Sequence, residues 1–524
     1  MFKRRFFARQ KDGLPIVGGA ALVAIILLLL CGMVGIMLVK GMQHFWPNPL
    51  YQVSYVDEQD QPQQMYATLL SRDFITTRGQ KRWLFNQAKL YQFSDQQHLL
   101  RQEQIITLLA LPDLIDVQLR SGNRLFARLN GLTFAGKAVD INRLPNVLQD
   151  VSAEVAAISA IEQGRLAAIH QLLAEYDRRG VEVDAPARVK LEDEFAALMA
   201  ELKSRRSQMT QFELQLLFDS GQSYALPLWE VEKYQQINQQ TAVQRFATFL
   251  SNIWEFVSDT PKRANSAGGV FPALFGTVVM VLLMTLIVTP LGVMAAIYLN
   301  EYAPENSLTS LIRIGVNNLA GVPSIVYGVF GLGFFVYQVG GNIDKLFFSE
   351  HLPAPTFGAP GIFWASLTMA MLTLPVVIVA TEEGLRRVPN SLRQGSYALG
   401  ATQFETLWRT VIPMASPGIM TGVILAIARG AGEVAPLLLV GAVKFAPTLP
   451  LDGEFPYLHL DRQFMHLGVL IYDGAFHSNS IGHGSSMMFA SCLLLLLVVM
   501  TLNIVAVMVR SRLRRQYQAM AGHW

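Results

Sequence analysis

The stretch from residue 394 to residue 413, QGSYALGATQFETLWRTVIP, lies between two long apolar segments and carries the most specific pattern in the chain. Gly400 stands between two short helix-like stretches, and Pro413 comes where the second apolar segment begins. This order predicts two short helices joined by a glycine turn, with small residues that a groove on another protein can approach closely. The simpler interpretation is an ordinary helix-turn-helix loop.

Six apolar segments are near the length needed to cross a membrane as a helix, which is about 20 residues. They run from Leu14 to Val39 and, farther along, over residues 270–298, 309–336, 361–381, 414–442 and 485–509. The first is longer than the roughly 7 to 15 apolar residues of a cleaved signal peptide, so we expect a retained signal anchor. Because six is an even number, both ends of the chain face the same side.

Basic residues predict which side that is. The N-terminus is basic, and arginines gather between the fourth and fifth segments and after the sixth: Arg386, Arg387, Arg393, Arg409, Arg510, Arg512, Arg514 and Arg515. Cytoplasmic loops carry the excess of Lys and Arg, so we expect both termini and the loop at 383–413 in the cytoplasm. The predicted fold class is an α-helical polytopic membrane protein with six transmembrane helices.

The same topology sends residues 47–265 to the outer side as one soluble block, large enough for a core of its own. Apolar residues recur every three or four positions in 151–176 and 189–209, which predicts an antiparallel helical hairpin. Strand-turn-strand patterns flank it, so we expect an α+β domain of related β-hairpins into which the helical hairpin is inserted. These patterns cover residues 117–129, 214–228 and, more loosely, 53–70.

Composition argues against several other classes of function. Of the 524 residues 52% are hydrophobic and 15% are charged, and the formal net charge of +3 is too small to favour nucleic-acid binding. Cys31 and Cys492 lie in apolar runs, which indicates neither a disulfide framework nor a metal site. No Gly-x-x-x-x-Gly-Lys-Ser/Thr pattern of a phosphate-binding loop occurs. We therefore expect no catalytic residues and no cofactor in this chain. If ATP hydrolysis drives its function, the ATPase must be a separate subunit.

Arg429 and Glu433 are charged residues inside the fifth apolar segment. Counting from Pro417, Arg429 is expected ~18 Å along the helix, near the middle of a hydrocarbon core about 30 Å thick. Glu433 follows four residues later, which predicts that both side chains share one helix face. The two charges can neutralise each other and stabilise the helix bundle. Alternatively, the guanidinium binds a tetrahedral oxyanion, and Glu433 accepts its proton or holds the arginine between transits.

The 394–413 stretch resembles the coupling loop of ABC importer permeases, because Gly400 and Pro413 stand in that family's register. Gln394, Gly395 and Ser396 replace the family's Glu-Ala-Ala, so the carboxylate of that glutamate is missing here. Residues 429–438, RGAGEVAPLL, are similar to the R-A-x-G-E-T-A-P-L-L stretch of phosphate importer permeases of the A type. The likeness covers about 265–510 and the first helix, and the outer domain lies beyond it.

This resemblance implies a type I ABC importer permease that moves inorganic phosphate across the bacterial inner membrane and is itself no enzyme. The implied partners are a paralogous C-type permease subunit, an ATPase dimer that grips the loop, a periplasmic phosphate-binding protein and membrane lipid. We expect the substrate path at Arg429, Glu433, Asn318 and Ser324. The coupling loop is expected at Gln394, Gly395, Ser396, Ala398, Gly400, Ala401 and Pro413.

The expected layout has four parts. They are the N-terminus with the first helix (1–46), the outer domain (47–265), a five-helix permease core (266–510) and a cytoplasmic tail (511–524). Two alternatives stay open: a permease for sulfate or molybdate, since an arginine fork suits any tetrahedral oxyanion, and a membrane-anchored sensor whose outer domain binds a ligand. We also hypothesise that the helical hairpin clasps the binding protein or the partner permease.

Overall fold

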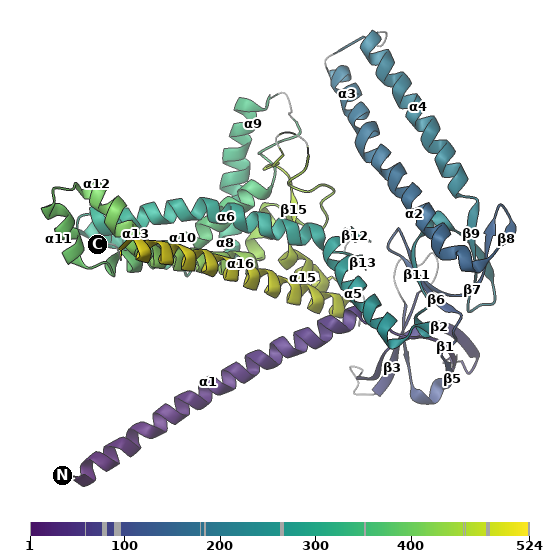
Figure 1. The fold of residues 1–524 in the computed structure, drawn as a ribbon, viewed down its shortest axis with the longest axis horizontal. Helices are drawn as coiled ribbons and strands as arrows, with labels where there is room; N and C mark the ends of the chain where they lie inside the picture. Colours follow the sequence, from purple (N-terminus) through teal and green to yellow (C-terminus); the bar gives the residue numbers. More distant parts are fainter. Residues whose placement is uncertain are drawn as a thin grey trace. The chain divides into compact units, whose positions relative to one another are not determined.

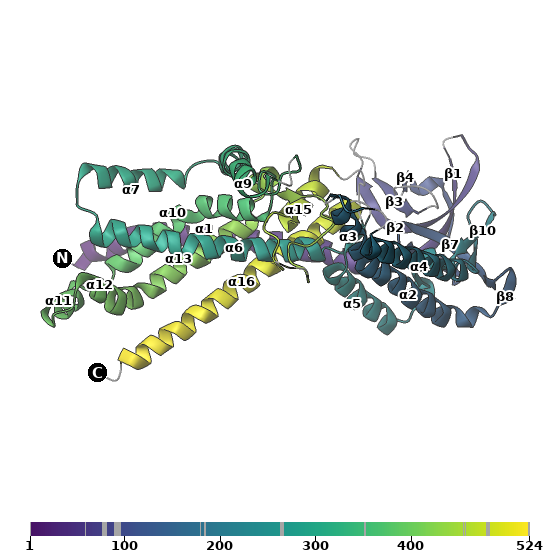
Figure 2. The ribbon, with the colours of Figure 1, turned by 90° about the horizontal axis from the view of Figure 1, so that it is seen from above.

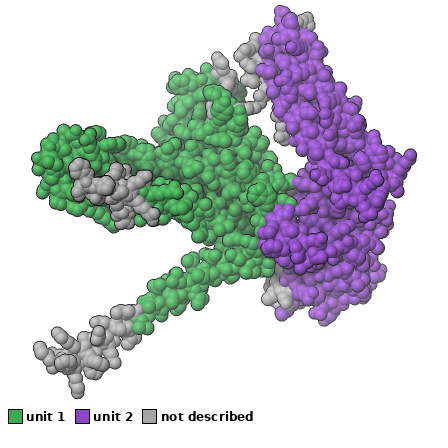
Figure 3. Space-filling view, viewed as in Figure 1, with its two compact units in different colours: residues 1–45, 253–524 green, residues 46–252 purple. Residues whose placement is uncertain are grey.

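The computed structural model describes residues 2–57, 59–75, 81–88, 96–178, 180–182, 185–262, 267–349, 353–453, 455, 457–477 and 483–521. The chain divides into two compact units (Figure 3). The helical unit contains residues 1–45 and 253–524, and the β-rich unit contains residues 46–252. Residues 522–524 of the expected cytoplasmic tail lie outside the described residues.

Within the described residues, six helical stretches are long and apolar enough to cross a membrane. They are α1 (Phe2–Phe45); α6 (Phe271–Ile297) with the π-helical turn η7 (Tyr298–Tyr302); α8 (Ser324–Phe330) with η8 (Gly331–Gly340) and α9 (Gly341–Phe347); α10 (Ile362–Arg386); α12 (Gln403–Thr406) with η10 (Leu407–Val411) and α13 (Ile412–Gly432); and α16 (His483–Ala521). The prediction of six spans is confirmed, and the chain is a multi-pass membrane protein.

The third span has other bounds than the predicted 309–336. Helix α7 (Ser307–Leu319) ends at a break, and the spanning stretch runs from Ser324 to Phe347. Pro323 has no N–H to donate and disfavours helical backbone at the residue before it, so the helix breaks there. Gly321 closes a turn by donating to the carbonyl of Asn318 over 3.0 Å. Both halves are apolar, which is why hydropathy alone did not predict the break.

The fifth span is also different from the predicted 414–442. Helix α13 ends at Gly432, Glu433 has extended backbone (φ −84°, ψ 130°), and a separate helix α14 (Ala435–Val440) follows with Pro436 in its first turn. Proline fits there because the first N–H groups of a helix have no intrahelical acceptor. The prediction that the two side chains lie together is borne out, since Arg429 and Glu433 form an i,i+4 ion pair at 3.8 Å, but Glu433 caps the helix end instead of continuing the helix.

Helix α10 forms the centre of the helical unit and packs against both α6 and α13 (Figure 2). Gly384 of α10 faces Gly418 of α13 so closely that a methyl group on Gly418 would lie 2.5 Å from the Cα atom of Gly384. Small residues at such a crossing let two membrane helices touch along their backbones. The main core of the unit is built by apolar side chains of these three helices, among them Met280, Met284, Val288, Met369, Leu372, Val377, Ala426 and Ile427.

Shorter elements connect the spans of the helical unit. They are α11 (Asn390–Ala398), α15 (Leu467–Phe476), the pair β12 (Pro261–Lys262) and β13 (Ala267–Gly268), and the pair β14 (Ala442–Val443) and β15 (Phe464–Met465). His466 caps α15, because its Nδ1 accepts a hydrogen bond from the N–H of Gly468 over 3.0 Å. Its side chain is buried, and burial lowers the pKa of His466 to about 3. The imidazole is therefore neutral at physiological pH.

The described strands of the β-rich unit form two antiparallel sheets (Figure 1). The first has the order β4-β3-β2-β1-β5, and the second has the order β10-β9-β7-β6-β11 with β8 beside β7. The strands are β1 (Leu50–Val56), β2 (Pro62–Ile75), β3 (Lys81–Gln87), β4 (Gln96–Leu100), β5 (Ile105–Leu109), β6 (Leu114–Leu119), β7 (Arg124–Phe134), β8 (Lys137–Val139), β9 (Phe212–Leu217), β10 (Ser223–Pro227) and β11 (Val231–Gln235).

The predicted hairpins at 117–129 and 214–228 are confirmed as β6–β7 and β9–β10 of the second sheet. Each turns at a glycine with positive φ, Gly122 (+83°) or Gly221 (+77°), a conformation that glycine adopts at no steric cost. The looser pattern at 53–70 is the hairpin β1–β2, but it belongs to the first sheet. The hairpins of the expected α+β domain are therefore confirmed, and they are divided between two sheets.

The predicted helical hairpin is confirmed, and it is inserted between β8 and β9 (Figure 1). One arm consists of α2 (Leu144–Ile161), η3 (Glu162–Leu166) and α3 (Ala167–Arg178), and the other of α4 (Pro186–Met209). The base packs into the core of the second sheet through Leu144, Val151, Ile158, Leu202 and Met209. Ion pairs also join the arms, from the base outward: Arg205–Glu154 (2.7 Å), Arg206–Glu162 and Arg165–Glu194 (2.7 Å). A further helix, α5 (Ala242–Ser258), follows β11.

Candidate functional site

The loop that the sequence singled out consists of two short helices around a glycine turn. Helix α11 ends at Ala398, Gly400 has a φ of +84°, and α12 begins at Gln403. The hydroxyl groups of Ser396 and Thr406 lie 2.8 Å apart and join the two helices. The structure thus brings together the loop residues Gln394, Gly395, Ser396, Ala398, Gly400 and Ala401, and it places Pro413 in the first turn of α13.

This loop exposes large apolar side chains that the sequence analysis missed. Leu399 at the glycine turn is 90% exposed, and Phe404 and Trp408 are each 65% exposed. The rings of Phe404 and Trp408 stack, with centroids 6.4 Å apart and planes at 10°. Exposed aromatic and aliphatic anchors of this kind are what a groove on a partner protein binds. The available signal was the position of these apolar residues in a stretch otherwise rich in arginine.

An ion pair ties the loop to the end of the span α6–η7. Arg393 Nη2 donates to Glu301 Oε1 over 2.8 Å, and the two side chains are only 16% and 12% exposed. The same guanidinium donates to the carbonyl of Leu385 (3.0 Å), and Gln403 Nε2 donates to the carbonyl of Glu301 (3.0 Å). The sequence analysis noted the missing carboxylate at Gln394 but missed that Arg393 beside it makes a buried pair with a residue 92 positions away.

Arg429 and Glu433 lie where α13 ends. Arg429 is in the last turn of the helix, and its Nε atom is 3.8 Å from Oε1 of Glu433. That distance is too long for a hydrogen bond, so the pair does not use up the N–H donors of the guanidinium. The side chains are 32% and 26% exposed, which leaves both accessible. Next to Arg429, Gly430 packs against Met284 of α6, where a methyl group would lie 2.5 Å from the sulfur atom.

Tyr327 connects the arginine with the break between α7 and α8. Its hydroxyl donates to the carbonyl of Leu319 over 2.9 Å, which satisfies an acceptor that the broken helix leaves free. Its ring belongs to the same apolar core cluster as Ile427, two residues before Arg429. Asn318 lies in the last turn of α7 and Ser324 opens α8. Among the described residues, no hydrogen bond or ion pair joins the side chain of Asn318 or Ser324 to Arg429.

A second charged cluster lines a cavity of about 210 Å³ between α7 and α10. Glu382 of α10, whose side chain is 13% exposed, lies 3.9 Å from Arg313 of α7 and 3.6 Å from Arg386. Arg313 also donates to the carbonyl of Leu299 over 2.6 Å. The sequence analysis did not select Arg313 or Glu382, although both are charges at the edge of apolar segments.

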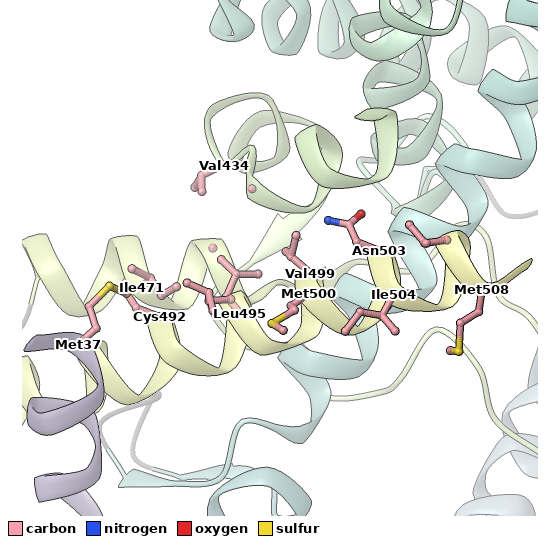
Figure 4. Close-up of a pocket in the computed structure, with 14 residues that line it drawn as sticks. Met37, Val434, Ile471, Cys492, Leu495, Val499, Met500, Asn503, Ile504 and Met508 are labelled. Atoms are coloured by element: carbon pink, nitrogen blue, oxygen red, sulfur yellow. The ribbon is translucent and has the colours of Figure 1, made fainter. Parts of the chain in front are cut away.

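A pocket of about 830 Å³ in the helical unit is apolar (Figure 4). Side chains of α16 line most of it, and Val434, Ile471 and Met37 complete the wall. The polar side chain in this wall is Asn503. An anion would lose its hydration there without meeting a cation, so this pocket is not where a charged substrate binds. Among the described residues, no group of three or more His, Cys, Asp or Glu could hold a metal ion.

Known proteins match the helical unit. Residues 288–515 match the family described as binding-protein-dependent transport system inner membrane component. The phosphate transport system permease protein PstA 1 of Mycobacterium tuberculosis (strain CDC 1551 / Oshkosh) is 36% identical over 244 residues, which are 47% of this chain and 71% of that protein. The PstA protein of Yersinia pestis is 34% identical over 252 residues, 48% of this chain and 75% of that protein.

Among solved structures, an inward facing conformation of the MetNI methionine ABC transporter is 16% identical, with a TM-score of 0.35 over 46% of this chain and 94% of that chain. An overlap this low adds nothing to the assignment, which rests on the sequence relatives and the six spans. The β-rich unit lies outside the residues that the family description matches. The similarity to the PstA proteins shows that the chain belongs to the PstA-type permeases, the membrane subunits of ABC importers.

Proposed function

We propose that this permease imports inorganic phosphate across the bacterial inner membrane, and that Arg429 meets the anion on its way. The observation that carries the proposal is a partly exposed guanidinium with free donors at a helix end, next to a broken span. Relatives of the chain are named phosphate transport permeases, which supports phosphate as the substrate. Placing Arg inside a membrane costs roughly 2.5 to 3.5 kcal/mol, so such residues are usually functional.

The chemistry of the site suits a tetrahedral oxyanion. A guanidinium is always charged and presents a planar fork that binds two phosphate oxygens at once. Glu433 lies 3.8 Å from the guanidinium, where its carboxylate can accept a hydrogen bond from the hydroxyl of hydrogen phosphate or hold the arginine after the anion leaves. The break between Leu319 and Ser324 supplies backbone groups at membrane depth, as in transporters whose discontinuous helices bind substrates. Asn318 and Ser324 flank this break as further donors.

The coupling loop is the proposed contact with a separate ATPase dimer. Leu399, Phe404 and Trp408 supply the apolar anchors, and the glycine turn fixes how they are presented. The Arg393–Glu301 pair then transmits a movement of the loop to the span α6–η7, because the two charges are nearly buried and costly to separate. Helix α6 packs on α10, and its residue Met284 lies against Gly430, which directly follows Arg429. Force applied at the loop therefore reaches the proposed anion site through packed helices.

The proposed assembly also contains a paralogous C-type permease subunit and a periplasmic phosphate-binding protein. Arginines near the ends of α10 and α16 support cytoplasmic termini and a periplasmic β-rich unit. We propose that the helical hairpin α2–α4 clasps the binding protein or the partner subunit. Membership of the permease family replaces the alternative of a membrane-anchored sensor, whereas sulfate and molybdate remain outcomes of the test.

The test is uptake of labelled phosphate by cells that lack their native A-type subunit and express this chain with the other subunits of the importer. We expect uptake to be restored, and excess unlabelled phosphate to suppress it while sulfate and molybdate at the same concentration do not. Cells that express the Gly400→Leu variant, in which the turn of the coupling loop is disrupted, give the background uptake against which restoration is measured. Equal suppression by sulfate or molybdate, or no restored uptake from a chain that reaches the membrane with its partners, would contradict the proposal.

A further inference from the structure

Helix α5 carries an exposed apolar stripe that the permease function does not use (Figure 2 shows the helix). Val243, Phe246, Leu250 and Trp254 are 79%, 53%, 51% and 71% exposed. Their spacing of three, four and four residues places them on one face of the helix. Gln244 lies about 100° around the helix and begins a separate polar face with Ser251. So large an apolar stripe on a folded surface indicates a surface that is covered.

The end of α5 is fixed at the mouth of two membrane spans. The N–H of Val270, directly before α6, donates to the carbonyl of Phe256 over 2.8 Å, and the N–H of Phe271 donates to that of Asp259 over 3.2 Å. Phe256 also packs on Phe45, the last residue of α1, with ring centroids 5.1 Å apart. The last turn of α5 therefore lies level with the end of α1 and the start of α6.

Gly268 lets the chain before α6 approach the residues that follow α5 closely. A methyl group on Gly268 would lie 2.5 Å from the carbonyl oxygen of Thr260, and the β12–β13 pairing holds Lys262 beside Ala267. The described start and end of the link between α5 and α6 are therefore held against each other by strand pairing. A helix that ends at this level and is amphipathic along its length meets the boundary between lipid and water.

We propose that α5 lies in the membrane interface, with the stripe Val243, Phe246, Leu250 and Trp254 inserted among the phospholipids of the leaflet on the side of the β-rich unit. Trp254 occupies the end nearest the spans, and tryptophan favours the headgroup level because its ring is apolar and its N–H is polar. Trp46, which follows α1 directly, packs on Phe249 of the same helix with ring centroids 5.6 Å apart. The helix thus places aromatic side chains at the level where the chain leaves the membrane.

The test measures the depth of the stripe in the full chain, reconstituted in vesicles of phosphatidylethanolamine and phosphatidylglycerol. Cys31 and Cys492 are first replaced by alanine, and a spin label is attached to single cysteines at Val243, Phe246, Leu250 or Trp254, with Gln244→Cys as the matched control. We expect accessibility to oxygen relative to a water-soluble nickel chelate to be several-fold higher at the four stripe positions than at Gln244. The labels should lie about 5 to 10 Å below the headgroup surface.

Two results would overturn the proposal. Stripe labels as open to the nickel chelate as the label at Gln244 would place the helix in water. Labels shielded from both reagents would show that protein, a partner subunit or a second copy, covers the stripe. An unlabelled chain gives an independent check, since brominated phosphatidylcholine must quench the part of the fluorescence that Trp254→Phe removes; absence of that quenching contradicts insertion.

Discussion

Two nearly buried side chains decide how the coupling loop is held. Arg393 and Glu301 are 16% and 12% exposed and make a 2.8 Å contact, whereas Arg387 and Glu383 on α10 are 82% and 66% exposed at 3.7 Å. Surface pairs contribute about 0 to 1 kcal/mol, but removing one partner of a buried pair costs roughly 3 to 5 kcal/mol. The contrast distinguishes the nearly buried pair, which we propose transmits force from the loop, from a pair of charges that faces the solvent.

Arg393→Gln should therefore abolish most uptake while the protein still reaches the membrane, because Glu301 is left as a buried charge. Arg387→Gln is the matched control and should transport normally. The measurement is phosphate uptake together with the ATPase activity of the purified complex. We expect ATP hydrolysis that no longer drives transport in Arg393→Gln, and partial recovery in the exchanged pair Arg393→Glu with Glu301→Arg. Normal coupled transport in Arg393→Gln would refute the role of the pair.

His466 gives the helical unit a dependence on pH. Its folded pKa of about 3 lies below the ordinary histidine value of 6.5, so the folded state resists protonation. The stability that the neutral imidazole contributes is complete above about pH 6.5 and is lost as pH falls toward 3, by up to ~1.4 kcal/mol per pH unit. His466→Asn keeps a cap acceptor for α15 and removes the titration. Its melting temperature should fall less between pH 7 and pH 5 than that of the unaltered chain; parallel curves would contradict this.

At the scale of elements, the crossing of α10 and α13 depends on the absence of side chains. Gly418→Ala puts a methyl group 2.5 Å from the Cα atom of Gly384, and overpacking of this kind costs typically about 1 to 3 kcal/mol. We expect a lower melting temperature in detergent. Gly432→Ala, in a position with no neighbouring atom within 4 Å, should leave the melting temperature nearly unchanged. Equal melting temperatures of the two variants would show that the helices can move apart freely.

The helical hairpin can be shortened without opening the core at its base. Residues 167–198 include α3 and the outer half of α4, while Ile158, Leu202 and Met209 remain in place to cover the second sheet. Replacing 167–198 with a short Gly/Ser linker should leave the β-rich unit folded and weaken binding of the phosphate-binding protein or of the partner permease to the complex. Affinity is measured with purified components in nanodiscs. Unchanged affinity for both proteins would contradict the proposed clasp.

For the whole molecule, the sequence predicted what short-range patterns determine. Spans follow from hydropathy and hairpins from turns such as Ser121–Asn123, so the six spans, the helical hairpin and three β-hairpins could be predicted. Long-range pairing could not: nothing local says that β1–β2 joins β3, β4 and β5 in a separate sheet. The same holds for the pairing of Glu301 with Arg393, whereas Gly321 and Pro323 already indicate the break after Leu319 in the sequence. At the candidate site, Arg429 was predicted from its cost in a membrane, while Tyr327 was missed because an apolar run hides it.

The most direct test of the account is phosphate uptake by Arg429→Lys and Arg429→Ala, each expressed with its partner subunits and checked for membrane insertion and bound ATPase. A charge-assisted hydrogen bond contributes about 1.5 to 3 kcal/mol, so losing the fork should reduce uptake by roughly 10-fold or more in both variants, with lysine retaining more than alanine. Uptake by Arg429→Ala at the unaltered rate would show that the arginine and Glu433 only stabilise the helix bundle, and that the anion takes another path.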